Sequence, residues 1–124
     1  MIIGTGIDII EINRVEKAVS KAGFREKVFS EAEQEYCDGR GKQGRASYAG
    51  RWAAKEAICK AIGCGISGGR LNELEIIPTT DGRPVVKLGE DWKLLLPAEA
   101  KIHITISHSR DYAIAQCVIE NNNQ

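Results

Sequence analysis

The spacing of apolar residues predicts one strand at the start of the chain, then helices, and strands again in the second half. Residues 2–10 are rich in isoleucine and are typical of a strand. Two helix-capping signals follow, Asn13 with Glu16 and Ser30 with Glu33. The predicted helices cover residues 13–21, 31–38 and 46–62, with a glycine-rich loop at 38–44 between the last two.

Beyond Gly68 and Gly69 the pattern favours strands. The predicted strands cover residues 74–77, 84–88, 102–107 and 112–119, with a short helix over 91–96. Asp81-Gly82 marks the turn of a hairpin. The last strand is apolar on both faces except for Gln116, so we expect it to be central or covered by a helix or another subunit. These elements predict a single α+β domain over residues 1–124. Helices cover one side of a mostly antiparallel sheet, and residues 121–124 form a disordered tail.

Composition and charge exclude several classes of protein. The 124 residues carry 17 basic and 17 acidic side chains, and this formal net charge of zero disfavours a nucleic-acid binder. No stretch approaches the roughly 18 consecutive apolar residues of a membrane span. The first residues also lack the basic segment and cleavage site of a signal peptide. We therefore expect a cytoplasmic protein with no membrane segment.

The long predicted helix carries two cations one turn apart, Arg51 and Lys55. Like charges at this spacing repel one another, so the pair suggests an anion between them. A solvated helix face, with Glu56 and Lys60 as an ordinary ion pair, is the alternative. The opposite arc of the helix holds small residues suited to close packing on the sheet: Gly50, Ala54, Ala57, Ile58 and Ala61.

Asp8 interrupts an isoleucine-rich strand, where a buried carboxylate is costly unless it is paired or binds a metal. Exposure on a polar face of the strand is the alternative. Magnesium typically takes one or two carboxylates together with substrate phosphates. Asp8 and Glu56 form such a pair if the fold brings them together.

A third polar cluster follows a predicted strand near the C-terminus. His103, Thr105 and Ser107 share one face of that strand. His108 and Ser109 fall at its end, where imidazole and hydroxyl groups can meet a ligand, although an ordinary polar turn fits as well. The chain has no recognisable nucleophilic triad and no Walker-type glycine loop, so those reaction classes are disfavoured.

Taken in order, these segments resemble the holo-[acyl-carrier-protein] synthase family, the short type of 4′-phosphopantetheinyl transferase. The resemblance covers nearly the whole chain, and five motifs in the same order make it specific. The motifs are Gly6-Ile7-Asp8-Ile9 with Arg14, Phe29-Ser30-Glu31-Ala32-Glu33, Gly50-Arg51-Trp52-Ala53-Ala54-Lys55-Glu56-Ala57 with Lys60-Ala61, Gly82-Arg83-Pro84, and Ser107-His108-Ser109.

The resemblance implies an Mg²⁺-dependent enzyme of fatty-acid and lipid metabolism that transfers 4′-phosphopantetheine from coenzyme A to a serine of apo acyl-carrier protein. It implies that Asp8 and Glu56 bind the metal and that Lys60 acts beside them. The acceptor of the serine proton stays unassigned, either Glu56 or a water at the metal. The residues implied to bind the coenzyme are Arg51, Lys55, Lys60, Arg83, Pro84, His108 and Ser109.

Arg14 matches the family's carrier-docking pattern, and Lys17, Lys21 and Arg25 follow at near-helical spacing. We expect this basic stripe to dock an acidic carrier-protein helix, with a solvated helix face as the alternative. The resemblance and the apolar last strand also predict a homotrimer with sites at its interfaces, with Arg14 across the boundary from the two acids. Two other functions stay open: another Mg²⁺-dependent transferase or hydrolase of a nucleotide pyrophosphate, and a non-catalytic carrier-protein binder.

Overall fold

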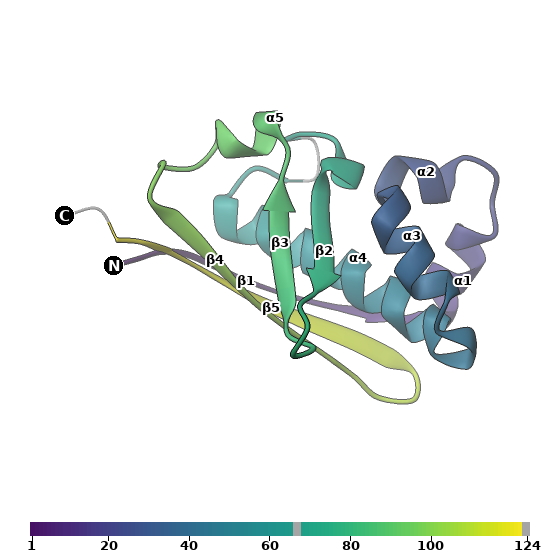
Figure 1. Ribbon diagram of the computed structural model, residues 1–124. Helices are drawn as coiled ribbons and strands as arrows, with labels where there is room; N and C mark the ends of the chain where they lie inside the picture. Colours follow the sequence, from purple (N-terminus) through teal and green to yellow (C-terminus); the bar gives the residue numbers. More distant parts are fainter. Residues whose placement is uncertain (66–67, 123–124) are drawn as a thin grey trace.

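A computed structural model describes residues 1–65 and 68–122 (Figure 1). Its helices are α1 (Ile12–Val19), α2 (Phe24–Val28), α3 (Glu31–Asp38), α4 (Gly44–Ile62) and α5 (Glu90–Lys93), with short 3-10 turns at Gly41–Gln43 and Leu71–Glu73. Its strands are β1 (Ile2–Glu11), β2 (Leu74–Pro78), β3 (Pro84–Leu88), β4 (Ala100–His108) and β5 (Tyr112–Asn121). None of the described helices is long and apolar enough to cross a membrane.

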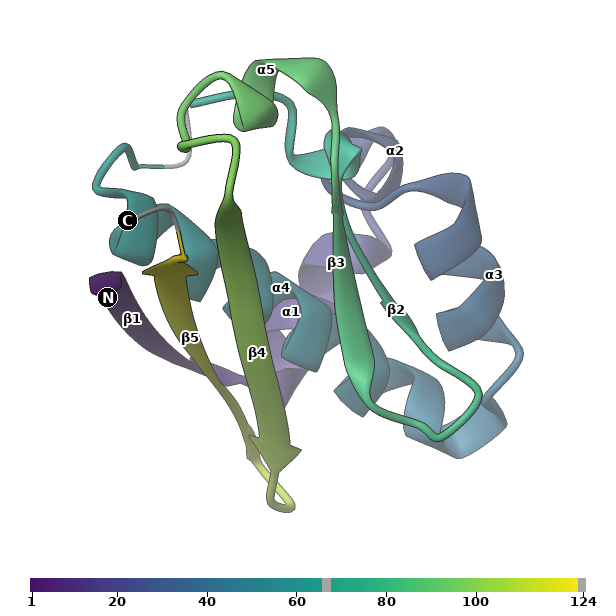
Figure 2. The same ribbon diagram turned by 60° about the vertical axis from the view of Figure 1, so that its left-hand side comes forward.

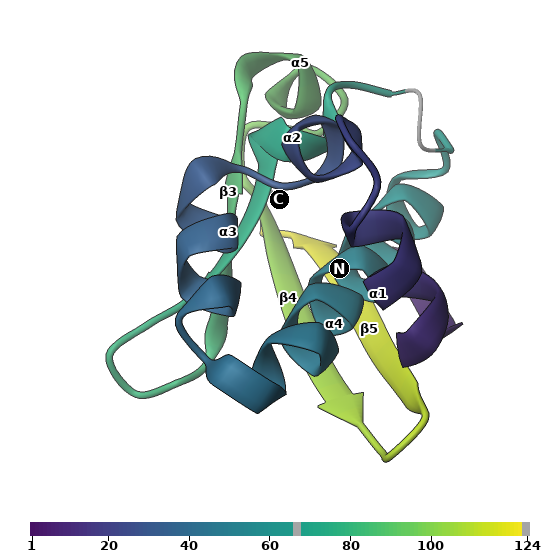
Figure 3. The same ribbon diagram turned by 90° about the vertical axis from the view of Figure 1, so that its right-hand side faces the viewer.

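The strands form two antiparallel groups. β1, β5 and β4 make a three-stranded sheet in that order, and β2 pairs with β3 in a separate hairpin (Figure 2). Helix α4 packs on β1 and β5, and α1 and α3 pack against α4 in turn (Figure 3). The predicted α+β class, with helices on one side of a mostly antiparallel sheet, is confirmed.

Most of the predicted elements are present, and the differences have local causes. The capping box of Ser30 and Glu33 forms with both hydrogen bonds. Asn13 caps nothing, because α1 begins one residue earlier after Glu11 and the Asn13 amide oxygen accepts a hydrogen bond from Arg45. Helix α2 was not predicted, since five residues are too few to show a helical period.

The two ends of the chain are joined in the sheet. Asn121 donates its backbone N–H to the carbonyl of Met1 at 2.8 Å, and strand β5 includes Asn121. The predicted tail at 121–124 is therefore wrong for Asn121, because the ladder with β1 continues to it. Residues 123–124 lie outside the described residues.

The contact between β1 and α4 is unusually close because two glycines of β1 face the helix. A Cβ atom added to Gly6 would lie 2.0 Å from the carbonyl oxygen of Ala57, and one added to Gly4 would lie 2.0 Å from that of Ala61. The helix also presents small, fully buried residues to the sheet, as the sequence predicts. Backbone therefore packs directly on backbone along this interface.

The other face of the three-stranded sheet is uncovered in a single chain. Ile7, Ile9 and Tyr112 are 57%, 61% and 47% exposed on it, whereas Ala113, Ala115, Cys117 and Ile119 of β5 are buried under α4. The expectation that the last strand is central is confirmed, since β5 lies between β1 and β4 (Figure 2). Its second face, which bears Ile114 and Val118, is only partly buried in the described residues of one chain.

The glycine contact gives a stability prediction. Gly6→Ala forces a methyl group into the Ala57 carbonyl and should lower the free energy of unfolding by about 3 kcal/mol, measured by urea denaturation. Gly39→Ala is the matched control. Its backbone φ of −74° suits any residue, and an added Cβ meets no atom closer than 3.2 Å. It should change stability by less than about 1 kcal/mol. Equal losses in the two variants would contradict the account.

Candidate active site

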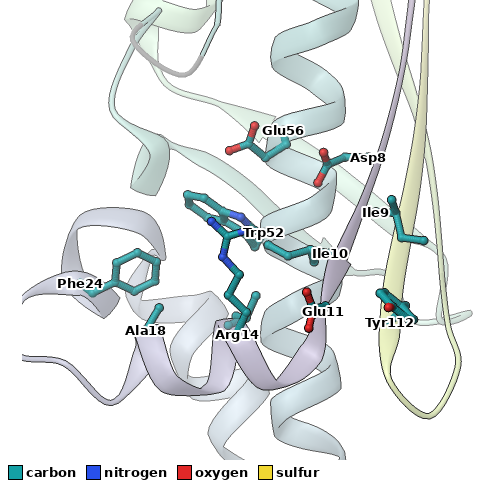
Figure 4. Close-up of a pocket in the computed structure, with 11 residues that line it drawn as sticks. Asp8, Ile9, Ile10, Glu11, Arg14, Ala18, Phe24, Trp52, Glu56 and Tyr112 are labelled. Atoms are coloured by element: carbon teal, nitrogen blue, oxygen red, sulfur yellow. The ribbon is translucent and has the colours of Figure 1, made fainter.

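A cavity of about 470 Å³ opens where β1, α1, α2 and α4 meet (Figure 4). Its lining combines carboxylates, one arginine and aromatic rings: Asp8, Ile9, Ile10, Glu11, Arg14, Val15, Ala18, Phe24, Trp52, Glu56 and Tyr112. The two acids predicted to bind a metal thus line one cavity, although 47 positions separate them in the sequence.

Asp8 lies on the face of β1 that packs on α4, the same face as Gly6 and Ile10, because side chains alternate along a strand. Its carboxylate is 18% exposed, so the alternative of an exposed polar face is excluded. Lys60 of α4 reaches across to β1. Its Nζ donates to the carbonyl of Ile7 at 2.9 Å and lies 3.3 Å from Oδ1 of Asp8.

Glu56 lies half-buried on α4 and points into the same cavity as Asp8 (Figure 4). Burial, and then the negative charge of Asp8, raise the pKa of Glu56, and Lys60 partly offsets them. A carboxylate whose charge is disfavoured by burial and by a neighbouring acid lies where a cation is stabilising. Magnesium takes one or two carboxylates and keeps several waters for substrate oxygens to replace, so Asp8 and Glu56 fit it.

Lys55 does not face a ligand, which corrects the prediction that it binds the coenzyme. Its ammonium group is fully buried and donates to Oε1 of Glu33 at 2.8 Å, to the carbonyl of Leu71 at 2.8 Å and to that of Leu74 at 2.6 Å. An ammonium group has three donors, and all three are used. The anion that the cation pair suggested is, for Lys55, the carboxylate of Glu33.

Arg51 differs from Lys55 in lacking an anionic partner. The residue is 7% exposed, and its guanidinium carbon lies 4.4 Å from the centre of the Tyr36 ring. Within residues 1–65 and 68–122 its Nε has no hydrogen-bond partner. A buried guanidinium with a free donor is a suitable group for a ligand phosphate, so Arg51 stays a coenzyme-binding candidate.

The remaining coenzyme candidates lie on two turns, and none of them lines the cavity. Arg83 follows the β2–β3 turn, where Nε and Nη2 contact Oδ2 of Asp81 at 3.0 and 2.8 Å. Pro84 begins β3. His108 ends β4, and the hydroxyl of Ser109 accepts the backbone N–H of Tyr112 at 3.3 Å in the β4–β5 turn.

The basic stripe divides in the structure. Arg14 lines the cavity and points toward Trp52 (Figure 4), and Lys17 and Lys21 are exposed beyond it. Arg25 is directed away, since it donates to Gln34 and pairs with Asp38 at 3.4 Å. Arg14 shares a cavity with Asp8 and Glu56 of its own chain, so the predicted separation of Arg14 from the acids by a subunit boundary is wrong.

Three aromatic residues line the cavity, Phe24, Trp52 and Tyr112, and none of them was in the predicted site. Phe24 of α2 and Trp52 of α4 lie with ring centres 5.7 Å apart and form its apolar wall. The position of Trp52, one turn before Glu56, was a usable signal, because residues four apart share a helix face. The sequence contained no such signal for Phe24, because Phe24 belongs to α2, which the pattern did not predict.

Comparison with known proteins agrees with this geometry. A model of the 4′-phosphopantetheinyl transferase superfamily matches residues 4–117. The chain belongs to this superfamily. It is 46% identical to a holo-[acyl-carrier-protein] synthase of Fusobacterium nucleatum, over 96% of this chain and 99% of that one. It is 43% identical to one of Clostridium tetani, over 97% of each. The resemblance drawn from the sequence is confirmed.

Solved structures of this superfamily have the same fold. The crystal structure of a holo-(acyl-carrier-protein) synthase from Bacillus anthracis, in complex with CoA (3′,5′-ADP), matches with a TM-score of 0.83 and 38% identity, over 98% of this chain and 99% of that one. The enzyme from Neisseria meningitidis matches with a TM-score of 0.87 and 28% identity, over 98% and 100% of the two chains. The transferase superfamily therefore accounts for nearly the whole fold.

Proposed function

We propose that this chain is a holo-[acyl-carrier-protein] synthase, which transfers 4′-phosphopantetheine from coenzyme A to a serine of apo acyl-carrier protein and releases adenosine 3′,5′-bisphosphate. The observation that carries the proposal is the pairing of Asp8 and Glu56 in one cavity, beside Lys60, in a chain of this superfamily. The similar Bacillus anthracis enzyme, in complex with CoA (3′,5′-ADP), supports the choice of substrate. The cytoplasmic location stays a prediction.

In this proposal the serine hydroxyl attacks the β-phosphorus of the coenzyme, and the bond from that phosphorus to the bridging oxygen breaks, so that this oxygen leaves with the bisphosphate. The serine proton passes to Glu56 or to a water, between which the acceptor stays unassigned. Asp8 and Glu56 would hold a magnesium ion, which would supply charge neutralisation at the pyrophosphate. Lys60 is 56% exposed, and its ammonium group already lies at Asp8, so it can donate to an adjacent phosphate oxygen. Arg51 stays a candidate for a further phosphate contact, although its Nε is buried and the residue does not line this cavity.

The carrier protein docks, in the same proposal, on the wall of the cavity that bears Arg14. This wall offers one cation and an apolar surface from Phe24 and Trp52, and Lys17 and Lys21 extend the positive surface along and just beyond α1. An acidic helix with a few apolar side chains complements it in charge and in polarity. Arg25 is left out of this surface, because Asp38 and Gln34 occupy its guanidinium.

The proposed assembly is a homotrimer. The uncovered sheet face, with Ile7, Ile9 and Tyr112 well exposed, is an apolar surface of the kind that stable interfaces bury. The candidate coenzyme contacts on the two turns do not line the cavity of their own chain. A trimer explains both observations if it buries the apolar sheet face and brings the β2–β3 and β4–β5 turns of one chain to the cavity of the next.

The metal assignment predicts loss of activity without loss of fold. Asp8→Ala or Glu56→Ala removes one of two carboxylate ligands and should reduce transfer by at least about 100-fold, while circular dichroism stays unchanged. The assay incubates coenzyme A, Mg²⁺ and apo acyl-carrier protein and measures the pantetheinylated serine by mass spectrometry.

EDTA should abolish transfer by the wild type, and added Mg²⁺ should restore it. Near-normal turnover of Asp8→Ala at low Mg²⁺ would show that the metal assignment is wrong. Cleavage of coenzyme A without a modified carrier would favour a nucleotide pyrophosphatase, and carrier binding without any bisphosphate product would favour a non-catalytic binder.

The docking surface predicts a selective effect of charge reversal at Arg14. Arg14→Glu should raise the KM for the carrier protein by about tenfold or more and change the KM for coenzyme A little, because charges at the edge of an interface act mainly on the encounter of the two proteins. Added salt should weaken carrier-protein binding by the wild type more than binding by the variant. Lys27→Glu on α2, outside the cavity, is the control. An equal rise in the KM for the carrier protein from this variant would contradict the docking role of Arg14.

The shared site predicts complementation between chains. Arg83→Ala and Glu56→Ala chains, each impaired alone, should regain part of the activity when they are refolded together, because some interfaces then combine an intact Glu56 with an intact Arg83. Sedimentation should show a trimer. A fully active monomer at micromolar concentration would exclude the assembly, and a trimer without complementation would place both groups in the site of one chain.

A further inference from the structure

Glu33 and Lys55 form an ion pair in which both side chains are fully buried. The carboxylate of Glu33 is saturated, as is the ammonium group of Lys55. Its Oε1 accepts the backbone N–H of Ser30 at 2.9 Å as well as Nζ of Lys55, and its Oε2 accepts the backbone N–H of Ile76 at 3.0 Å. The pair therefore joins the start of α3, the middle of α4 and strand β2.

Lys55 and Glu33 bind the edge of β2 in the way that a neighbouring strand would. The carbonyl of Leu74 accepts from Lys55 and the N–H of Ile76 donates to Glu33. In an extended strand these two groups point to the same edge, because they belong to residues two apart. The opposite edge of β2 pairs with β3. The ammonium group of Lys55 and the carboxylate of Glu33 thus supply the hydrogen bonds that a third strand would otherwise make to this edge of β2.

The hairpin held in this way is not part of the three-stranded sheet. In the described residues, β2 and β3 form a ladder only with each other, although β3 packs beside β4. The hairpin carries Arg83 and Pro84 at its turn, and α3 carries Tyr36, the ring on which Arg51 stacks. Three of the candidate coenzyme contacts, Arg51, Arg83 and Pro84, therefore depend on elements that meet at the buried pair.

We propose that Glu33 and Lys55 are positioning residues for coenzyme binding, which hold the β2–β3 hairpin and α3 against α4 so that Arg83 and Arg51 lie where the coenzyme needs them. The inference rests on the proposed function for its substrate. Lys55 does not contact the coenzyme in this inference, since its three donors are all occupied within the chain. It acts by positioning the residues that do.

The test compares three variants by their kinetics, below the unfolding temperature of each. Glu33→Gln keeps an acceptor for Ile76 but leaves the Lys55 ammonium without its charge partner. Glu33→Gln with Lys55→Met removes both charges and also the donors to Leu71 and Leu74. Tyr48→Phe is the matched control, because it deletes a hydrogen bond of 2.7 Å from α4 to Asp38 of α3 and does not touch β2.

The expected result is a split between the two substrates. Both Glu33 variants should raise the KM for coenzyme A by about tenfold, because small misplacements of binding groups weaken contacts steeply. The KM for the carrier protein and the Mg²⁺ requirement should change less than about twofold. Tyr48→Phe should leave all three constants near those of the wild type, even if its unfolding temperature falls as much.

Amide hydrogen exchange gives a second readout that does not require the enzymatic activity. In both Glu33 variants the amides of Ile76 and of Val85, which pairs with Ile77 in the ladder, should exchange at least about tenfold faster than in the wild type, and those of α1 should not. An equal rise in both KM values, or the same coenzyme effect in Tyr48→Phe, would overturn the positioning role. Unchanged exchange at Ile76 would also overturn it, whereas a wild type inactive with coenzyme A would instead reject the proposed function.

Discussion

The close contact between β1 and α4 fixes the geometry on which the rest of the site depends. The strand crosses the helix with backbone against backbone at Gly4 and Gly6. Asp8 follows Gly6 by two residues on the same face of the strand, and Glu56 directly precedes Ala57, whose carbonyl meets Gly6. A larger residue at either glycine would separate strand and helix by the width of a side chain and would move the two carboxylates apart with them.

The same contact has an electrostatic consequence. It holds two acids at the edge of a core, where burial and mutual repulsion raise the pKa of Glu56, and it supplies a single nearby ammonium group, that of Lys60. Such a site binds a cation more readily in its charged form than as two neutral acids. The proposed metal binding depends on this pair, so in that proposal the position of β1 on α4 links the packing of the core to the chemistry.

The sequence predicts elements well where the signal is local. The Ser30–Glu33 capping box, the Asp81-Gly82 turn and the end of α4 at Gly63 each depend on residues a few positions apart, and all three are present. Asn13 failed as a cap because Ile12 already begins the helix. Asp8 was identifiable because a carboxylate in an apolar strand is costly, which is true before the fold is known.

The partners of Arg51 and Lys55 were not predictable in this way. Their spacing on one helix suggested an anion between them, and within the part of the chain that the structure describes only Lys55 has one. Its partner is Glu33, 22 residues away, which the sequence had already identified as part of a capping box. Arg51 is stacked instead on Tyr36 of α3. Helical periodicity assigns a residue to a face of its own helix and contains no information on what packs there.

The burial of Glu33 and Lys55 has a structural reason beyond their attraction. An apolar pair of the same volume is often as stable as a buried ion pair, so charge alone does not explain these residues. In this fold an apolar pair would leave the carbonyls of Leu71 and Leu74 and the N–H of Ile76 without partners, at a cost of about 1–3 kcal/mol for each group. The ion pair is stabilising because it hydrogen-bonds both a donor and an acceptor at the free edge of β2, the N–H of Ile76 and the carbonyl of Leu74. A two-stranded hairpin needs such an edge partner, since hairpins of this size are only marginally stable alone.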